Sequence, residues 1–259
     1  MEKLGQYFLT SKTNLQKIVM ALDLKADDSV IEIGPGHGEL TNELRIMNYE
    51  LRITAIEKDE EFVRYLQEKF AQDKNIEIVE GDVLKILPEL AKSRKIVGNI
   101  PYYITGHLLR IIGELENKPS LVVLTVQKEV AERICAPSQT NTGKKGRMNL
   151  LAASVQFWAE PEIIDYIPKT EFRPQPKVDS AIIRLVISSQ PLINSKDYYE
   201  LIKILFKQPR KTILNNLRAT NKTKEEIIKI LGELKINPAD RPQNLSVEQI
   251  KELSTQIKY

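Results

Sequence analysis

A glycine-rich turn is the first segment of the sequence that could bind a ligand. Gly34, Gly36 and Gly38 follow a short β-branched run at residues 29–33, and glycines in such a turn let the backbone approach a ligand closely. The dinucleotide pattern G-x-G-x-x-G would need its third glycine at position 39, which is Glu39. The turn therefore favours S-adenosylmethionine, a nucleoside cofactor without phosphates. A dinucleotide enzyme and a glycine turn without a ligand stay open as alternatives.

Two acidic residues follow the next two predicted strands. Glu57 comes nineteen residues after Gly38 and could accept hydrogen bonds from both ribose hydroxyls. Asp82 follows Gly81 and could accept one from the amino group of an adenine. Either residue could instead be a solvated acid or a helix cap. Because parallel strands end at the same edge of a sheet, we expect these acids to bind one nucleoside together with the glycine turn.

The segment Asn99, Ile100, Pro101 and Tyr102 follows a fourth predicted strand. The oxygen of the Asn99 side chain and the backbone carbonyl of Ile100 could accept the two hydrogens of an exocyclic amine, which orients its lone pair toward a methyl donor. Pro101 would fix the turn, and Tyr102 would give the base an aromatic face. The alternative is a turn with a capping asparagine and a core tyrosine. The segment indicates methyl transfer to a base nitrogen.

The elements that must position these residues alternate between strand and helix. Thr13 is predicted to cap a first helix, and Asp59 another. Strands are expected at residues 29–33, 51–56, 76–79, 95–97 and 121–126, helices at 39–47, 59–70, 108–115 and 129–134, and closing strands at 155–167 and 180–187. Such alternation predicts an α/β fold, a Rossmann-like parallel sheet with helices on both faces. Residues 138–145 are expected to form a surface loop.

Charge and periodicity divide the chain near residue 188. Residues 1–180 carry a net charge of −3, whereas residues 181–259 carry +6 and show only helical periodicity. We therefore predict a methyltransferase domain at 1–188 and a small all-helical RNA-binding domain at 189–259. A solvated lysine-rich helix face would give the same charge. The candidate phosphate contacts are Lys207, Arg210, Lys211 and Arg218.

The composition of the 259 residues excludes several classes of protein. Hydrophobic residues make up 42% and charged residues 28%, which is typical of a folded globular chain. One cysteine, Cys135, cannot form an internal disulfide, and two histidines offer little for a soft-metal site. There is no stretch of 18 apolar residues and no G-x-S-x-G elbow. We expect a cytoplasmic protein that needs no metal and contacts no membrane.

Six segments in chain order resemble ribosomal RNA adenine dimethyltransferases of the small-subunit type. They are residues 5–9 (GQYFL), 32–41 (EIGPGHGELT), 99–102 (NIPY), 126–133 (VQKEVAER), 172–180 (FRPQPKVDS) and the tail positions 206, 210–212, 215–217, 241–242 and 245–246. No single segment is decisive, but six in order are specific. The resemblance covers nearly the whole chain.

The resemblance implies dimethylation of two adjacent adenines near the 3′ end of small-subunit ribosomal RNA, within an immature small ribosomal subunit. It places Phe172 beside the target base. It implies cofactor contacts from the N-terminal and glycine-turn segments and from the catalytic asparagine, namely Tyr7, Leu9, Glu32, Gly34, Gly36 and Asn99. Tyr7 stands where the family usually has Asn or His near the cofactor.

Two other functions stay open. Enzymes that confer macrolide resistance methylate large-subunit RNA and share the cofactor and N-I-P-Y motifs, but residues 178–180 and 241–246 favour the small-subunit type. A ribosome-assembly factor of the same fold could bind RNA without catalysis, although Glu57, Asp82 and Asn99 are all retained. We expect the chain to act as a monomer.

Overall fold

The computed structural model describes residues 6–26, 28–47, 50–91, 94–136, 147–188 and 195–257. These residues form two compact units. The first comprises Met1–Ala131 with Glu160–Ile187, and the second comprises Glu132–Ala159 with Ser188–Tyr259. Each unit has its own buried apolar residues, as expected of parts that can each bury a core.

A seven-stranded sheet forms the centre of the first unit, in the order β4-β3-β2-β5-β6-β9-β7. Its strands are β2 (Ser29–Ile33), β3 (Arg52–Glu57), β4 (Ile76–Glu80), β5 (Lys95–Asn99), β6 (Leu121–Gln127), β7 (Ala159–Ile167) and β9 (Ser180–Ile187). Strands β2 to β6 pair in parallel, as predicted, whereas β9 pairs antiparallel with β6. The α/β fold class is confirmed, with a mixed sheet in place of a purely parallel one.

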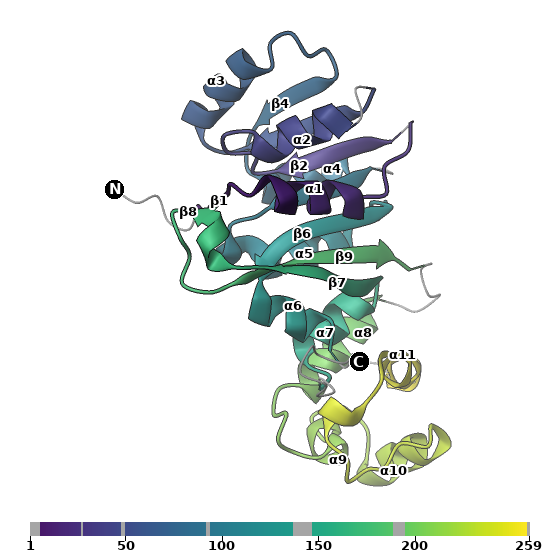
Figure 1. Cartoon of the computed structure of the whole chain (residues 1–259). Coiled ribbons are helices and arrows are strands. Elements are labelled where there is room, and N and C mark those ends of the chain that lie inside the picture. The colour runs from purple at the N-terminus through teal and green to yellow at the C-terminus, as the bar shows by residue number, and fades with distance from the viewer. Residues whose placement is uncertain are drawn as a thin grey trace. The chain divides into compact units, whose positions relative to one another are not determined.

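Helices pack on both faces of this sheet (Figure 1). Helices α1 (Lys12–Ala21) and α2 (Glu39–Met47) pack against each other on one face, and α4 (Val83–Leu90) and α5 (Thr105–Glu114) pack against each other on the other. Helix α3 (Glu60–Lys69) packs on β3 and β4. With both faces covered, β2 and β5 are buried along almost their whole length. The carboxyl ends of β2 to β5 are thereby held in a fixed row.

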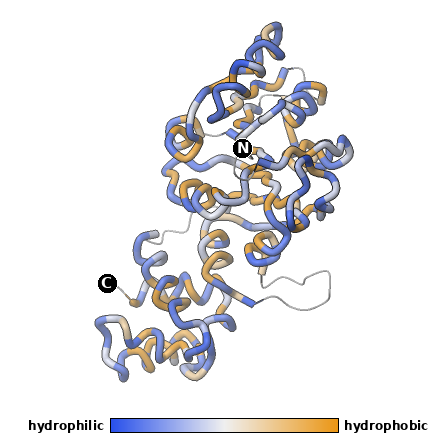
Figure 2. The backbone as a smooth tube through the Cα atoms, turned by 90° about the vertical axis from the view of Figure 1, so that its left-hand side faces the viewer, coloured by the Kyte–Doolittle hydropathy of each residue, from blue (hydrophilic) through white to orange (hydrophobic). Residues whose placement is uncertain are grey.

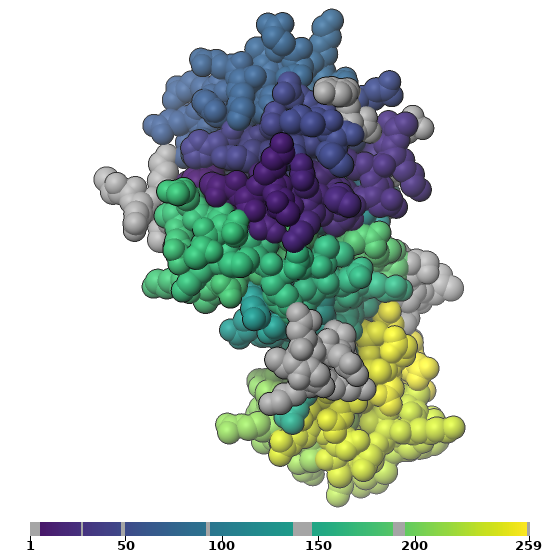
Figure 3. Space-filling model, viewed as in Figure 1, coloured from purple at the N-terminus to yellow at the C-terminus, as the bar shows by residue number. Residues whose placement is uncertain are grey.

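The N-terminal arm is attached to a distant part of the same unit. Strand β1 (Phe8–Leu9) pairs antiparallel with β8 (Phe172–Arg173), which follows the short 3-10 helix η2 (Lys169–Glu171). Nearby, Lys17 Nζ lies 2.5 Å from Asp165 Oδ2. In the space-filling view the purple N-terminal residues lie against the green residues of this segment (Figure 3). The arm is therefore fixed close to the carboxyl ends of the strands.

The second unit is helical. It contains α7 (Leu150–Gln156), α8 (Ser195–Leu205), α9 (Ile213–Leu217), α10 (Lys224–Glu233) and α11 (Val247–Gln256), and helix α6 (Lys128–Ile134) spans the boundary between the units. Hydrophobic and hydrophilic residues alternate along these helices (Figure 2), as expected when each helix buries one face. Residues 132–159, which we expected in the first domain, group with the C-terminal helices because α7 packs on α8 and α11.

Two expected elements were wrong in detail. Helix α1 begins at Lys12 with Ser11 at its N-cap, so Thr13 lies inside the helix and not at its cap. Residues 155 and 156 belong to α7, whose N-terminus is capped by Asn149, and β7 starts only at Ala159. Short apolar runs do not distinguish helix from strand by periodicity alone. The expected loop at 138–145 lies outside the described residues.

Candidate active site

The glycine turn between β2 and α2 has the backbone conformation that requires glycine. Gly34, Gly36 and Gly38 have φ angles of +64°, +58° and +79°, in the left-handed region that other residues adopt at a cost. A methyl group at Gly36 would also lie 2.6 Å from Cε1 of Phe8. The arm and the turn thus meet at Gly36, and the predicted close approach of this backbone to a ligand stays a prediction.

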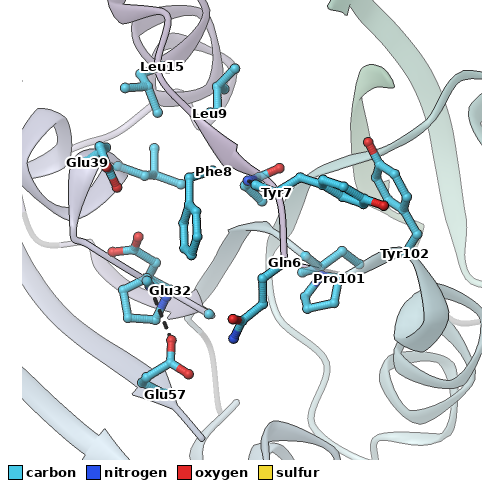
Figure 4. A pocket seen from close by; sticks show the side chains of 16 residues that line it. Gln6, Tyr7, Phe8, Leu9, Leu15, Glu32, Glu39, Glu57, Pro101 and Tyr102 are labelled. Carbon is cyan, nitrogen blue, oxygen red and sulfur yellow. Dashed lines mark hydrogen bonds between the residues drawn. The ribbon is translucent and has the colours of Figure 1, made fainter. Parts of the chain in front are cut away.

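Glu57 lies at the end of β3, as predicted, and is 6% exposed. Its Oε2 accepts a hydrogen bond from Gly36 N at 3.2 Å, and its Oε1 accepts from Lys58 N at 2.8 Å and Asp59 N at 3.0 Å. Figure 4 draws the bond that joins Glu57 to the turn. A carboxylate has about four acceptor positions, so this one retains capacity for a ligand hydroxyl while its orientation stays fixed.

Glu32 is a buried carboxyl group with one oxygen, Oε2, that has no hydrogen-bond partner among the described residues. It is 1% exposed at β2. Burial raises the pKa of Glu32 to about 8. It lines a small pocket with Glu39 and Glu57 (Figure 4). Glu32 is therefore mostly protonated at neutral pH in this pocket, and a cationic ligand group, such as the ammonium of S-adenosylmethionine, would favour loss of that proton.

Asp82 lies beside a larger cavity of about 550 Å³, which shares Gly34 and Glu57 with the small pocket. Asp82 caps α4 by accepting from Leu84 N at 3.1 Å, and it also accepts from Lys58 Nζ at 3.0 Å. Partial burial raises its pKa, but these hydrogen bonds lower it more, and the pKa lies below its usual value. Asp82 is therefore an ionised acceptor at the cavity, which fits the predicted adenine contact.

Asn99 ends β5, where Gly98 allows close packing because a methyl group at that position would lie 2.7 Å from Ile33 O. Its Nδ2 donates to the backbone carbonyl of Tyr7 at 2.7 Å. A carbonyl oxygen only accepts, so this bond determines which end of the amide is nitrogen. The amide oxygen is then the atom left to accept from a substrate amine, and that role of Asn99 stays a prediction.

Tyr102 follows Asn99 in the short 3-10 helix η1 (Tyr102–Ile104). Its hydroxyl lies 2.7 Å from Ser180 Oγ, and its ring centroid is 5.3 Å from that of Tyr7, with the planes tilted by 34°. Burial raises the pKa of Tyr102, so the phenol stays neutral. Ile100 is buried, and Pro101 lines both cavities. These residues form the predicted turn beside the pocket.

The structure does not bring Phe172 to the pocket. Phe172 is 2% exposed, is paired with Leu9 through β1 and β8, and belongs to the main apolar core. Its expected stacking on a base requires a rearrangement that uncovers the ring. Leu9 does line the small pocket, as the resemblance implied. Gln6 and Lys58 also line the cavities. Neither was among the predicted site residues, although both are next in the sequence to residues that were.

The candidate RNA contacts lie in the second unit. Lys207, Arg210 and Lys211 are exposed in the turn between α8 and α9, and Arg218 is exposed just after α9. Asn216 Nδ2 donates to the carbonyls of Gln208 and Thr212, both at 3.1 Å. The turn that presents three of these cations is therefore held in one conformation.

Within the described ranges, no group of three or more His, Cys, Asp or Glu side chains is placed to hold a metal ion. In the same ranges, no helix is both long and apolar enough to cross a bilayer.

Comparisons with known proteins agree with this geometry. The family model described as "Ribosomal RNA adenine dimethylase" matches residues 1–258. "Ribosomal RNA small subunit methyltransferase A" of Dehalococcoides mccartyi is 39% identical over 96% of this chain and 86% of its own length. The protein of the same name from Lactococcus lactis is 35% identical, over 98% and 88%.

Two solved structures are also similar. A dimethyladenosine transferase from Plasmodium falciparum has a TM-score of 0.80 at 26% identity, covering 95% of both chains. The 23S rRNA methyltransferase ErmE has a TM-score of 0.74 at 26% identity, covering 96% of this chain and 99% of its own. Since the family model spans almost every residue and the relatives match over nearly all of this chain, the chain belongs to the ribosomal RNA adenine dimethylase family.

Proposed function

We propose that the chain dimethylates the exocyclic amines of two adjacent adenines near the 3′ end of small-subunit ribosomal RNA. The observation that carries this proposal is the Asn99 amide, whose nitrogen is engaged by Tyr7 O and whose oxygen is therefore the acceptor beside Tyr102. The relatives at 34% to 39% identity carry the small-subunit name. The similar 23S enzyme structure is 26% identical, and the large-subunit alternative is not favoured.

S-adenosylmethionine supplies an electrophilic methyl group. After the methyl is transferred, the remainder of the cofactor is a neutral thioether. The residues of this chain would hold that cofactor through complementary charge and hydrogen bonds. Glu32 would face its cationic end, Glu57 would accept from its ribose, and Asp82 would accept from its adenine amine. Gly34 and Gly36 bring the backbone close. Because Glu57 and Asp82 are already fixed by hydrogen bonds, the site is largely preorganised.

The target amine is the nucleophile, and its lone pair is partly delocalised into the purine ring. Asn99 Oδ1 and the Ile100 carbonyl accept the two amine hydrogens, which turns the lone pair toward the methyl group. Each transfer forms one N–C bond, breaks one S–C bond and releases one proton. Orientation of this kind accelerates a reaction because the acceptors are in place before the transition state forms.

We also propose that the C-terminal unit grips RNA phosphates through Lys207, Arg210, Lys211 and Arg218, and that the substrate is an immature small ribosomal subunit in the cytoplasm. The +6 charge of residues 181–259 and the exposure of these cations support this. We propose that a single copy of the chain is active, and light scattering of the active sample would test this.

The proposed activity is tested by incubating the protein with labelled S-adenosylmethionine and immature small subunits, then mapping the modified adenines. Two adjacent dimethyladenines are expected. Asn117, exposed in the segment between α5 and β6, offers a matched control, because Asn117→Ala should leave the modification intact. Methylation of large-subunit RNA alone, or of no adenine, would contradict the proposal.

A further inference from the structure

Helix α3 packs against the outer side of the glycine turn. A methyl group at Gly38 would lie 2.9 Å from Leu66 Cδ2 and 2.9 Å from Phe70 Cε2. One residue earlier, the backbone carbonyl of His37 accepts a hydrogen bond from Lys69 Nζ at 2.7 Å. The turn is therefore held against the end of α3 at two successive residues.

The side chain of His37 connects this support to the N-terminal arm. Its ring centroid lies 4.4 Å from that of Phe8 and 4.9 Å from that of Phe62, with interplanar angles of 73° and 71°. The centroids of Phe8 and Phe62 are 5.6 Å apart, also edge to face. Aromatic pairs are favourable in this geometry. The three rings thus join the arm, the glycine turn and α3.

Two glycines of the turn have different neighbours. A methyl group at Gly36 would lie 2.6 Å from Cε1 of Phe8, so this ring covers Gly36. A methyl group at Gly34 would have no described atom within 4 Å, and Gly34 lines both cavities. The arm therefore occupies the turn at Gly36 and leaves Gly34 accessible to a ligand.

The small pocket lies between the arm and the turn. Residues 6–9 line one side of it, and Glu32, Gly34 and Gly36 line the other (Figure 4). Its volume is about 70 Å³, which is room for a few water molecules. The methionine end of S-adenosylmethionine is larger than this. The arm must therefore move relative to the turn when the cofactor enters or leaves.

We propose that His37 and Phe62 are positioning residues that hold the arm closed over the cofactor, because they fix the ring of Phe8 on Gly36. His37 and Phe62 line neither cavity, so each acts through Phe8. The inference rests on the proposed placement of the cofactor at the glycine turn. Opening of the arm breaks the ring contacts of Phe8, and these contacts limit the rate of cofactor release. Each substrate consumes several cofactor molecules, so this rate bears directly on turnover.

Four variants separate the aromatic contacts from other properties of these side chains. His37→Ala removes the ring, whereas His37→Phe keeps an aromatic ring in its place. Phe62→Leu keeps an apolar side chain without an aromatic edge. Arg64→Ala is the matched control, because Arg64 is exposed on α3 and lines neither cavity. Thermal unfolding of each variant establishes that the fold is retained.

The kinetic test measures how fast labelled S-adenosylmethionine dissociates when an excess of unlabelled cofactor is added. His37→Ala and Phe62→Leu should each raise the dissociation rate by about 2- to 13-fold, the range expected for losing one aromatic pair. His37→Phe and Arg64→Ala should dissociate at the wild-type rate. A wild-type rate in His37→Ala would overturn the proposal, as would a failure of His37→Phe to restore the rate.

A double-mutant cycle tests whether His37 acts through Phe8. Phe8→Ala removes both ring contacts of the arm, so it should raise the dissociation rate more than His37→Ala does. Adding His37→Ala to Phe8→Ala should then raise the rate no further. If the effects of the two substitutions multiply, His37 acts on the cofactor by another route and the proposal is wrong.

Hydrogen exchange of β1 in the cofactor-free protein tests the hold on the arm directly. The backbone amides of β1 should exchange faster in His37→Ala than in wild type, because the arm opens more often. Arg64→Ala should exchange like wild type. Equal exchange in His37→Ala and wild type would contradict the proposal. If the protein binds no S-adenosylmethionine, the placement of the cofactor fails, whereas hydrogen exchange still decides whether His37 holds the arm.

Discussion

Replacing Glu32 by glutamine should change how the stability of the protein depends on pH. Burial raises the pKa of Glu32 to about 8 from an ordinary 4.5, so the folded protein keeps this proton at pH values where the unfolded chain has lost it. Unfolding therefore becomes easier as the pH rises from 4.5 to 8. At about 1.4 kcal/mol per pH unit, the loss reaches at most about 5 kcal/mol.

Urea unfolding at pH 5.5, 6.5 and 7.5 measures this contribution. Wild type should lose free energy of unfolding across this window, and Glu32→Gln should lose less. Burying the new amide in Glu32→Gln lowers the free energy of unfolding by the same amount at each pH. The change in free energy of unfolding with pH can therefore still be compared between the variant and wild type. The acids with lowered pKa values, Asp28, Asp82 and Asp165, add stability as the pH rises through a more acidic range, so they do not obscure the effect.

Glu39→Gln provides a second comparison, because Glu39 lines the same pocket and its charge helps to raise the pKa of Glu32. It should reduce the loss of stability with rising pH by less than Glu32→Gln does. Parallel curves for wild type and Glu32→Gln would refute the reasoning, since they would show that Glu32 binds no extra proton on folding. Glu32 would then have to be ionised in the empty pocket, with a partner that compensates its charge.

Gly36→Ala should weaken S-adenosylmethionine binding at least tenfold by calorimetry. The added methyl would lie 2.6 Å from the ring of Phe8, and the φ angle of +58° at this position disfavours alanine. Unchanged affinity would show that the glycine turn does not bind the cofactor. Phe172→Ala should lower the free energy of unfolding by about 3 to 5 kcal/mol, since the ring is buried in the core. Reduced methylation of RNA by a variant as stable as wild type would show instead that Phe172 stacks on the target base. Charge reversal at the exposed cations Lys207, Arg210 and Lys211 should weaken RNA binding and flatten its salt dependence without altering cofactor affinity. An unchanged dependence of RNA affinity on salt would show that these side chains contact solvent and no phosphate.

The sequence predicted the positions of those site residues that lie at the carboxyl ends of strands. Glu57 and Asn99 follow β-branched runs whose parallel pairing requires no information beyond the alternation of strand and helix. The glycine turn was predictable for a similar reason, because its left-handed conformations favour glycine over other residues. In each case the residue types of a short segment, together with the parallel direction of the strands, were sufficient for the prediction.

The parts that were not predicted depend on contacts between distant segments. Tyr7 meets Tyr102 and Asn99 only because β1 pairs with β8, more than 160 residues later in the chain, and nothing in a two-residue strand signals that partner. The same pairing covers Phe172. Residues 132–159 join the C-terminal helices through packing on α8 and α11, which neither charge nor periodicity along the chain reveals.

Product analysis of Asn99→Ala shows whether Asn99 orients an adenine amine for methylation. Wild type, Asn99→Ala and Asn117→Ala are each incubated with S-adenosylmethionine and immature small subunits, and the nucleosides are quantified by mass spectrometry. We expect dimethyladenosine from wild type and Asn117→Ala, and turnover reduced by about 100-fold or more in Asn99→Ala at unchanged RNA affinity. Full turnover by Asn99→Ala would show that the Asn99 amide does not orient the amine.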